Sequence, residues 1–142
     1  MLNKPFVRRK IKLLQEDLAR LQPLAALSFA TLQKNRMSYD AGERILERIV
    51  TRALDINRHL IAELALPTQK IRDNYDTFLA LADLKIVPQK FAKTIAPSSG
   101  LRNVLAHEYD EIDMQLIYDS FGDALKQYAR YCVHLIKFID TK

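Results

Sequence analysis

Apolar residues recur at helical spacing in three long segments of the chain. In the first segment they are separated by four and three residues in turn, at Val7, Ile11, Leu14, Leu18 and Leu21. This spacing places them on one face of an α-helix, with polar residues on the opposite face. Because proline lacks an amide hydrogen, we expect the helix to bend or end at Pro23 and residues 24–35 to continue as helix.

The second long segment has the same repeat. Its apolar positions are Ile45, Ile49, Ala53, Ile56 and Leu60. Asp40 and Glu43 precede these positions with the D-x-x-E spacing of a capping box, so we expect this helix to begin after Asp40. Pro67 predicts that it ends near Leu66.

The last segment has the longest repeat. Its apolar positions are Ile117, Phe121, Leu125, Tyr128, Cys132, Leu135 and Ile139. Asp110 and Asp113 precede it as a cap, and shorter helices are expected from near Asp73 and from Pro88. No stretch alternates apolar and polar residues as a hairpin strand would. We therefore predict one all-α domain over residues 1–142, an up-and-down bundle of four to six helices.

Composition narrows the class of protein. Cys132 is the single cysteine, which excludes an internal disulfide and a cysteine-based zinc site. No run of 18 apolar residues occurs, so we expect no membrane span. The basic N-terminal segment resembles a targeting peptide, but Glu16 and Asp17 interrupt it and no small-residue cleavage site follows. We interpret it as the first helix of a cytoplasmic protein.

Charge is distributed unevenly around a net value of +5. Residues 1–36 hold eight Lys or Arg and two acids, whereas residues 108–123 hold six acids and no base. The last helix also carries a basic stripe, formed by Lys126, Arg130, His134 and Lys137. Basic surfaces of this kind attract polyanions such as RNA. The alternative is that these charges only solvate helix ends and faces.

The segment RNVLAHEYDEID, residues 102–113, brings together groups that suit RNA cleavage. An imidazole transfers protons near neutral pH, and a guanidinium donates two hydrogen bonds to one phosphate. His107 would take the proton of the RNA 2′-hydroxyl or protonate the leaving oxygen, and Arg102 would stabilise the charge on the phosphoryl oxygens. No metal ion is needed for this chemistry. The alternative is that His107 only bonds a carbonyl at a helix end.

The spacing of arginine and histidine is weak evidence alone, because Arg52 and His59 form a comparable pair on the second helix. The longer string GLRNVLAHEYDEID, however, resembles the R-N-x-x-x-H-x-Y signature of the HEPN superfamily, specifically of HepT-like toxins. DINRHLI at 55–61 resembles the second helix of that family, and PTQKIRDNYDTFLAL at 67–81 resembles its segment before the motif helix. The resemblance covers roughly residues 5–139.

This resemblance implies an all-α homodimer that acts as a metal-independent ribonuclease toxin without a cofactor. Arg102 and His107 from the two subunits would meet in a cleft and cleave RNA, with tRNA as the substrate that the family suggests. Tyr109 would be the site of inactivation, where a partner, the minimal nucleotidyltransferase antitoxin MntA, attaches AMP from ATP. A bulky anion on Tyr109 would block the cleft and repel RNA phosphate.

Two further residues are candidates for supporting roles. Asn103 would bond the backbone or orient Arg102, and Asp55 would act from the second helix. The alternative for Asp55 is a solvated helix face, and for Tyr109 a core or interface aromatic.

Two other functions remain open at this stage. The first is a non-catalytic HEPN domain that binds substrate for a nucleotidyltransferase. The second is a helical adaptor without a ligand, which would hold Arg102 and His107 apart in different surroundings.

Overall fold

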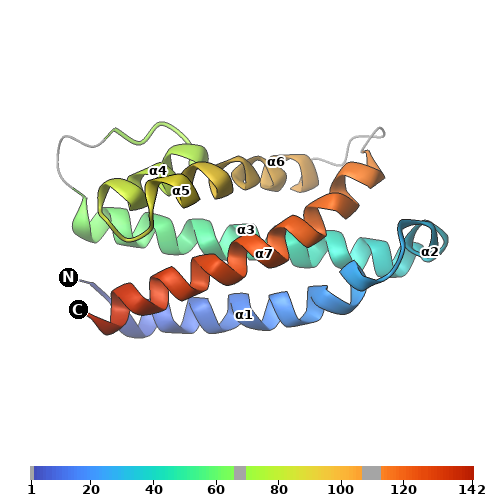
Figure 1. The fold of residues 1–142 in the computed structure, drawn as a ribbon, viewed down its shortest axis with the longest axis horizontal. Helices are drawn as coiled ribbons and strands as arrows, with labels where there is room; N and C mark the ends of the chain where they lie inside the picture. Colours follow the sequence, from blue (N-terminus) through green and yellow to red (C-terminus); the bar gives the residue numbers. More distant parts are fainter. Residues whose placement is uncertain (1, 66–69, 107–112) are drawn as a thin grey trace.

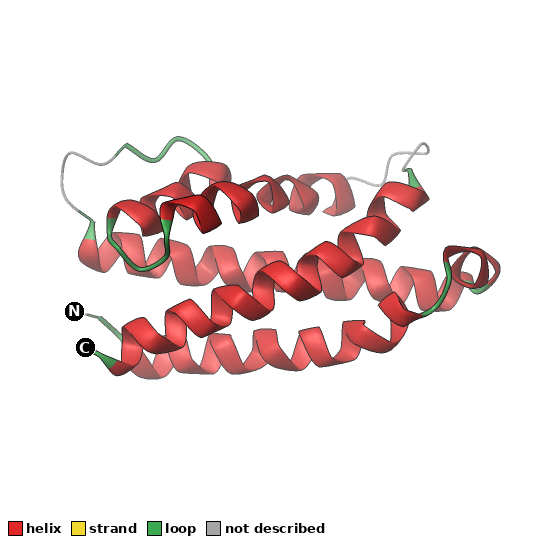
Figure 2. Cartoon of the chain, viewed as in Figure 1, coloured by secondary structure: helices red, strands yellow, loops and turns green. Residues whose placement is uncertain are grey.

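The computed structural model describes residues 2–65, 70–106 and 113–142, and these residues form helices without a strand (Figure 2). The helices in chain order are α1 (Lys4–Ala26), α2 (Phe29–Lys34), α3 (Arg36–Leu64), α4 (Asn74–Asp83), α5 (Gln89–Ile95), the 3-10 helix η1 (Ala96–Gly100), α6 (Leu101–Ala106) and α7 (Met114–Asp140). The predicted all-α bundle is confirmed. No helix in the described ranges is long and apolar enough to cross a membrane.

The three long helices α1, α3 and α7 run side by side and form the body of the molecule (Figure 1). The shorter helices α4, α5 and α6 form a second row, in which α4 and α6 pack on α3 and α5 packs on α4 and α7. The two ends of the chain lie together, where Lys4 donates a hydrogen bond to the carbonyl of Lys142 and Arg8 pairs with Asp140 at 2.9 Å. This arrangement leaves α6 next to the middle of α3.

The core lies between the apolar faces that the sequence predicts. All five predicted apolar positions of α1 and all five of α3 are buried. On α7 the predicted positions are also buried, except for Leu125, which is half-buried. Burial raises the pKa of the Cys132 thiol to about 12, so this side chain stays protonated in the core.

The predicted start of α3 is wrong. The helix begins at Arg36, and the side chain of Asn35 caps it by accepting a hydrogen bond from the amide of Ser38. Asp40 therefore lies inside the helix, where it pairs with Arg36 at 2.9 Å. Asparagine is as good a cap as aspartate, and the pair one turn apart stabilises the extra turn.

The other helix ends agree more closely with the sequence. α1 continues through Pro23 and ends at Ala26. Asp73 and Asp113 cap α4 and α7 with their side chains. Pro88 occupies the position just before α5. Capping is local chemistry, which explains why sequence spacing found most of these ends.

Candidate functional site

The first half of the RNVLAHEYDEID segment lies on α6, which η1 holds in place. The Ser98 hydroxyl of η1 donates to the carbonyl of Ile95 and lies 2.6 Å from the Tyr128 hydroxyl of α7. On α6, Leu105 is buried in the core, whereas Arg102 and Asn103 are exposed. α6 therefore uses one side for packing and presents Arg102 on the other.

Arg102 lines a surface pocket of about 260 Å³ between α1, α3 and α6. The other residues of this pocket are Lys10 from α1 and Arg44, Glu47, Arg48, Thr51, Arg52 and Asp55 from α3. We call it the basic pocket, because five of its eight lining residues are lysine or arginine. Two predicted site residues, Arg102 and Asp55, thus border the same pocket although they lie on different helices.

Asp55 does not lie on a fully solvated face. Its carboxylate pairs with the ammonium group of Lys10 at 3.1 Å, and its side chain is 44% exposed. α1 therefore covers part of the α3 face that carries Asp55. A role for Asp55 toward a bound ligand stays a prediction.

Arg52 and His59, the second arginine–histidine pair of the sequence, have separate contacts. His59 accepts a hydrogen bond from the amide of Asn3 through Nε2 at 3.1 Å, and its ring lies 5.0 Å from that of Phe6. Arg52 instead donates from Nε to Asp17 at 3.2 Å. This pair therefore serves the packing of α1 on α3, and the two side chains do not converge.

Asp17 is an important residue that the sequence reasoning missed. It is completely buried, and three arginines donate to its carboxylate. A signal was present in the sequence, since Asp17 lies three residues after Leu14 and four before Leu21, on the predicted apolar face. A carboxylate on a buried helix face needs a charged partner, which points to an ion cluster at this interface.

The other half of the motif is outside the described residues. His107 and Tyr109 belong to the range 107–112, and α6 is described as far as Ala106. The roles of Arg102, His107, Tyr109 and Asn103 stay predictions. Beyond the backbone hydrogen bonds of α6, the side chains of Arg102 and Asn103 make no hydrogen bond to another described residue. The described ranges contain no group of three or more His, Cys, Asp or Glu side chains that could hold a metal ion.

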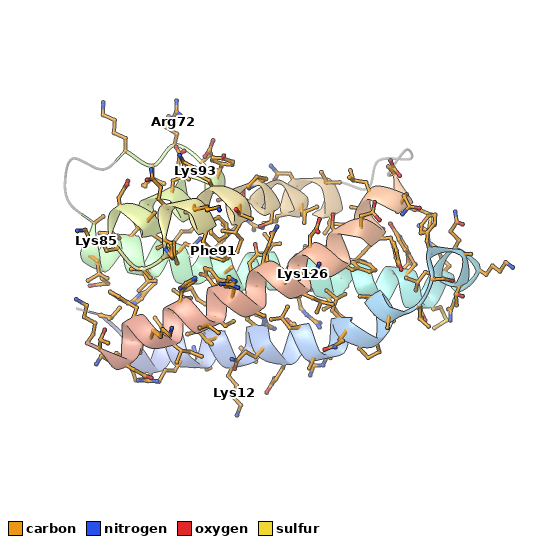
Figure 3. The ribbon with its side chains drawn as sticks, in the orientation of Figure 1. Lys12, Arg72, Lys85, Phe91, Lys93 and Lys126 are labelled. Carbon is orange, nitrogen blue, oxygen red and sulfur yellow. The ribbon has the colours of Figure 1, made fainter. Side chains whose placement is uncertain are left out.

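The basic stripe on α7 borders a different groove, beside α5. Lys126 and Arg130 line this groove together with Phe91 (Figure 3). The ring of His134 lies 5.0 Å from the ring of Phe91. Burial lowers the pKa of His134, and the positive charges of Arg130 and Lys137 lower it further. α5 thus covers part of the stripe, and none of the residues that line this groove also lines the basic pocket.

Comparison with known protein families gives a match to the family described as "Ribonuclease HepT-like" over residues 14–135. The matched range includes the whole motif segment. A "tRNA nuclease HepT" from Aphanizomenon flos-aquae is 39% identical over 99 residues, which cover 70% of this chain and 66% of that protein. A "Putative RNase" from Archaeoglobus fulgidus is 31% identical over 68 residues, which cover 48% of this chain and 49% of that protein. The chain thus matches less than two thirds of the length of either relative.

Solved structures share the fold at low sequence identity. A toxin–antitoxin crystal structure with AMP-PNP has a TM-score of 0.77 and 18% identity, covering 94% of this chain and 98% of the matched one. A tri-AMPylated HEPN toxin of Shewanella oneidensis in complex with an MNT antitoxin has a TM-score of 0.77 and 19% identity, covering 93% and 97%. At this identity the likeness establishes the helical architecture.

Proposed function

The chain belongs to the HepT-like ribonuclease family, and from this premise we propose that it cleaves RNA as the toxin of a toxin–antitoxin pair. The family match covers residues 14–135 and contains the complete R-N-x-x-x-H-x-Y string. The relative from Aphanizomenon flos-aquae carries the name of a tRNA nuclease, which makes tRNA the first substrate to test.

The observation that carries this proposal is the position of Arg102. It is exposed on α6, has no ion pair within the described residues, and lines a pocket with three arginines of α3. A guanidinium that is free of carboxylates keeps its donors available for a phosphate. The basic surroundings favour a polyanionic ligand.

In the proposed reaction the RNA supplies its own nucleophile. The 2′-hydroxyl loses its proton and attacks the adjacent phosphorus, and the bond to the 5′-oxygen breaks as that oxygen gains a proton. His107 takes the hydroxyl proton or protonates the leaving oxygen, and water exchanges the other proton. Arg102 donates to the phosphoryl oxygens, on which negative charge increases in the transition state. No step uses a metal ion. We propose a homodimer in which the Arg102–His107 pairs of two subunits border one cleft.

His107→Ala tests the reaction directly. We expect the wild-type protein to stop growth on expression and to cleave tRNA in the presence of EDTA, and the variant to do neither. Loss of cleavage in EDTA that Mg²⁺ restores would contradict a metal-independent reaction. RNA binding without cleavage by the wild type would favour the non-catalytic substrate-binding function.

Tyr109 is the proposed site of control by a nucleotidyltransferase antitoxin of the MntA type. We expect incubation with that partner and ATP to add one or more AMP units to the protein and to stop RNA cleavage. Mass spectrometry of the intact protein measures the addition. Tyr109→Phe is the matched control, because it lacks the acceptor hydroxyl and should remain unmodified. An AMP unit on Tyr109→Phe would assign the modification to another residue.

A further inference from the structure

Three arginines converge on the buried carboxylate of Asp17 at the interface between α1 and α3. Oδ1 accepts from Arg20 at 3.2 Å and from Arg48 at 2.9 Å. Oδ2 accepts from Nε of Arg52 at 3.2 Å. Asp17 thus fixes the position of two arginines on the neighbouring helix.

These contacts leave most donors of Arg48 and Arg52 available. A guanidinium has five N–H donors, and each of these two arginines gives one hydrogen bond to Asp17. Their side chains are 34% and 21% exposed, and both line the basic pocket. Nε of Arg48 is buried without a hydrogen-bond partner in the described part of the chain, so it is not among the donors that a ligand can reach. The partly exposed guanidinium groups of both arginines border the pocket, and Asp17 holds them in place.

The carboxylates that line the basic pocket are already engaged. Glu47 pairs with Arg44 at 3.3 Å, and Asp55 pairs with Lys10 at 3.1 Å. Within the described residues, neither acid pairs with Arg48, Arg52 or Arg102. The pocket therefore keeps an excess of positive charge that suits an anion.

We propose that the α3 side of the basic pocket binds a phosphate of the RNA backbone, next to the phosphate that Arg102 holds. Arg48 and Arg52 donate to this phosphate, and Asp17 is the positioning residue that aims them. This subsite rests on the proposed ribonuclease function, since it places the substrate strand along α3. The ligand is a phosphodiester of single-stranded RNA.

The test measures RNA binding in a His107→Ala background, in which the strand is not cut. Arg48→Gln and Arg52→Gln are each compared with Arg72→Gln. Arg72 is a suitable control because it also pairs with an aspartate, Asp76 at 3.4 Å, and extends from the α4 side of the molecule, away from Lys12 of α1 (Figure 3). Fluorescence anisotropy with a short RNA gives the affinity over a range of salt concentrations.

We expect Arg48→Gln and Arg52→Gln each to weaken RNA binding by about tenfold, with unchanged affinity for Arg72→Gln. Each lost phosphate contact should also lower the slope of log K against log salt by about 0.7. Equal affinities and slopes for all three variants would overturn the proposal. ATP and AMP serve as competitors, and displacement of RNA by either at an affinity equal to that of RNA would assign the pocket to a nucleotide instead.

The variant Asp17→Asn distinguishes a positioning role of Asp17 from an effect of its negative charge alone. Removing a negative charge strengthens RNA binding if Asp17 acts through its charge alone. If Asp17 aims Arg48 and Arg52, the same change weakens binding, because neither guanidinium is then held toward the phosphate. Tighter or unchanged binding would refute the positioning role. If this variant does not fold, the two arginine variants still decide the subsite.

The experiments distinguish a wrong subsite proposal from a wrong ribonuclease function. If the wild type cleaves RNA but Arg48→Gln and Arg52→Gln bind and cleave like the wild type, the subsite is wrong and the function stands. If the wild type cleaves no RNA, the function is wrong, and the binding series still decides whether the basic pocket takes RNA phosphate.

Discussion

Oδ2 of Asp17 on α1 accepts a hydrogen bond from Nε of Arg52 on α3 at 3.2 Å, and the Asp17 side chain is completely buried. The interface between these two long helices thus contains an ion cluster within otherwise apolar packing. Such a cluster makes each member dependent on the others, because a buried charge without its partner is costly.

Asp17→Asn should destabilise the protein by about 3 kcal/mol, since it leaves Arg48 and Arg52 partly buried without their carboxylate. Asp140→Asn is the matched control. Its pair with Arg8 is exposed, and its loss should cost less than about 1 kcal/mol. Urea unfolding measures both free energies. Equal costs for the two variants would show that the Asp17 cluster adds no stability.

Gly42→Ala should destabilise α3 packing by about 1–3 kcal/mol. A Cβ atom at this position would lie 2.5 Å from Cζ of Phe121, which is fully buried. Gly122→Ala is the control, because a Cβ there meets no atom within 4 Å. Alanine is the better helix former, so this change should stabilise α7 by up to about 1 kcal/mol. Thermal unfolding measures both, and a shift in the same direction would contradict the steric explanation.

Tyr131→Phe should cost about 1–3 kcal/mol, because the Tyr131 hydroxyl lies 2.6 Å from Oδ1 of the buried Asn57. Its loss leaves that oxygen without its donor, while Asn57 still donates to Thr77 at 3.1 Å. Tyr39→Phe provides the comparison. The Tyr39 hydroxyl is buried and makes no hydrogen bond of good geometry in the described part of the chain, although burial and the nearby Glu43 carboxylate raise its pKa, so its removal should cost less than removal of the Tyr131 hydroxyl. A larger loss of stability for Tyr39→Phe than for Tyr131→Phe in chemical denaturation would contradict this prediction.

His134 should make the stability depend on pH below about 6.5. Its pKa in the folded protein is lower than in the unfolded chain, so the unfolded chain binds the proton more readily. The contribution of neutral His134 to stability is complete above about pH 6.5. It is lost as the pH falls through the lower pKa that His134 has in the folded protein. His134→Gln should therefore flatten the fall in melting temperature between neutral and mildly acidic pH. Parallel curves for wild type and variant would exclude this role.

Arg102→Lys should lower the rate of RNA cleavage by about 100-fold and leave RNA affinity nearly unchanged. Lysine keeps the positive charge but cannot donate two hydrogen bonds to one phosphate in a fixed geometry. Single-turnover kinetics at saturating enzyme separate the rate from the affinity. A large loss of affinity with a normal rate would make Arg102 a binding residue instead of a catalytic one.

The helices themselves follow from local sequence patterns. Repeats of four and three residues predicted the buried faces of α1, α3 and α7, and side-chain caps such as Asp73 and Asp113 marked helix starts. The error at Asp40 has the same local origin. Asn35 offers an equally good cap one turn earlier, and periodicity does not choose between two adjacent caps.

The sequence by itself determined the helical class, the apolar faces and the motif residues, because helical periodicity and residue chemistry are local properties. The tertiary structure decided what lies beside Arg102. In the sequence, Asp17, Arg48 and Arg52 are separate charges on two amphipathic helices. The packing of α1 on α3 buries the carboxylate and places both arginines at the basic pocket beside Arg102. That pairing depends on which helix faces meet, which is settled by the packing of side chains far apart in the chain.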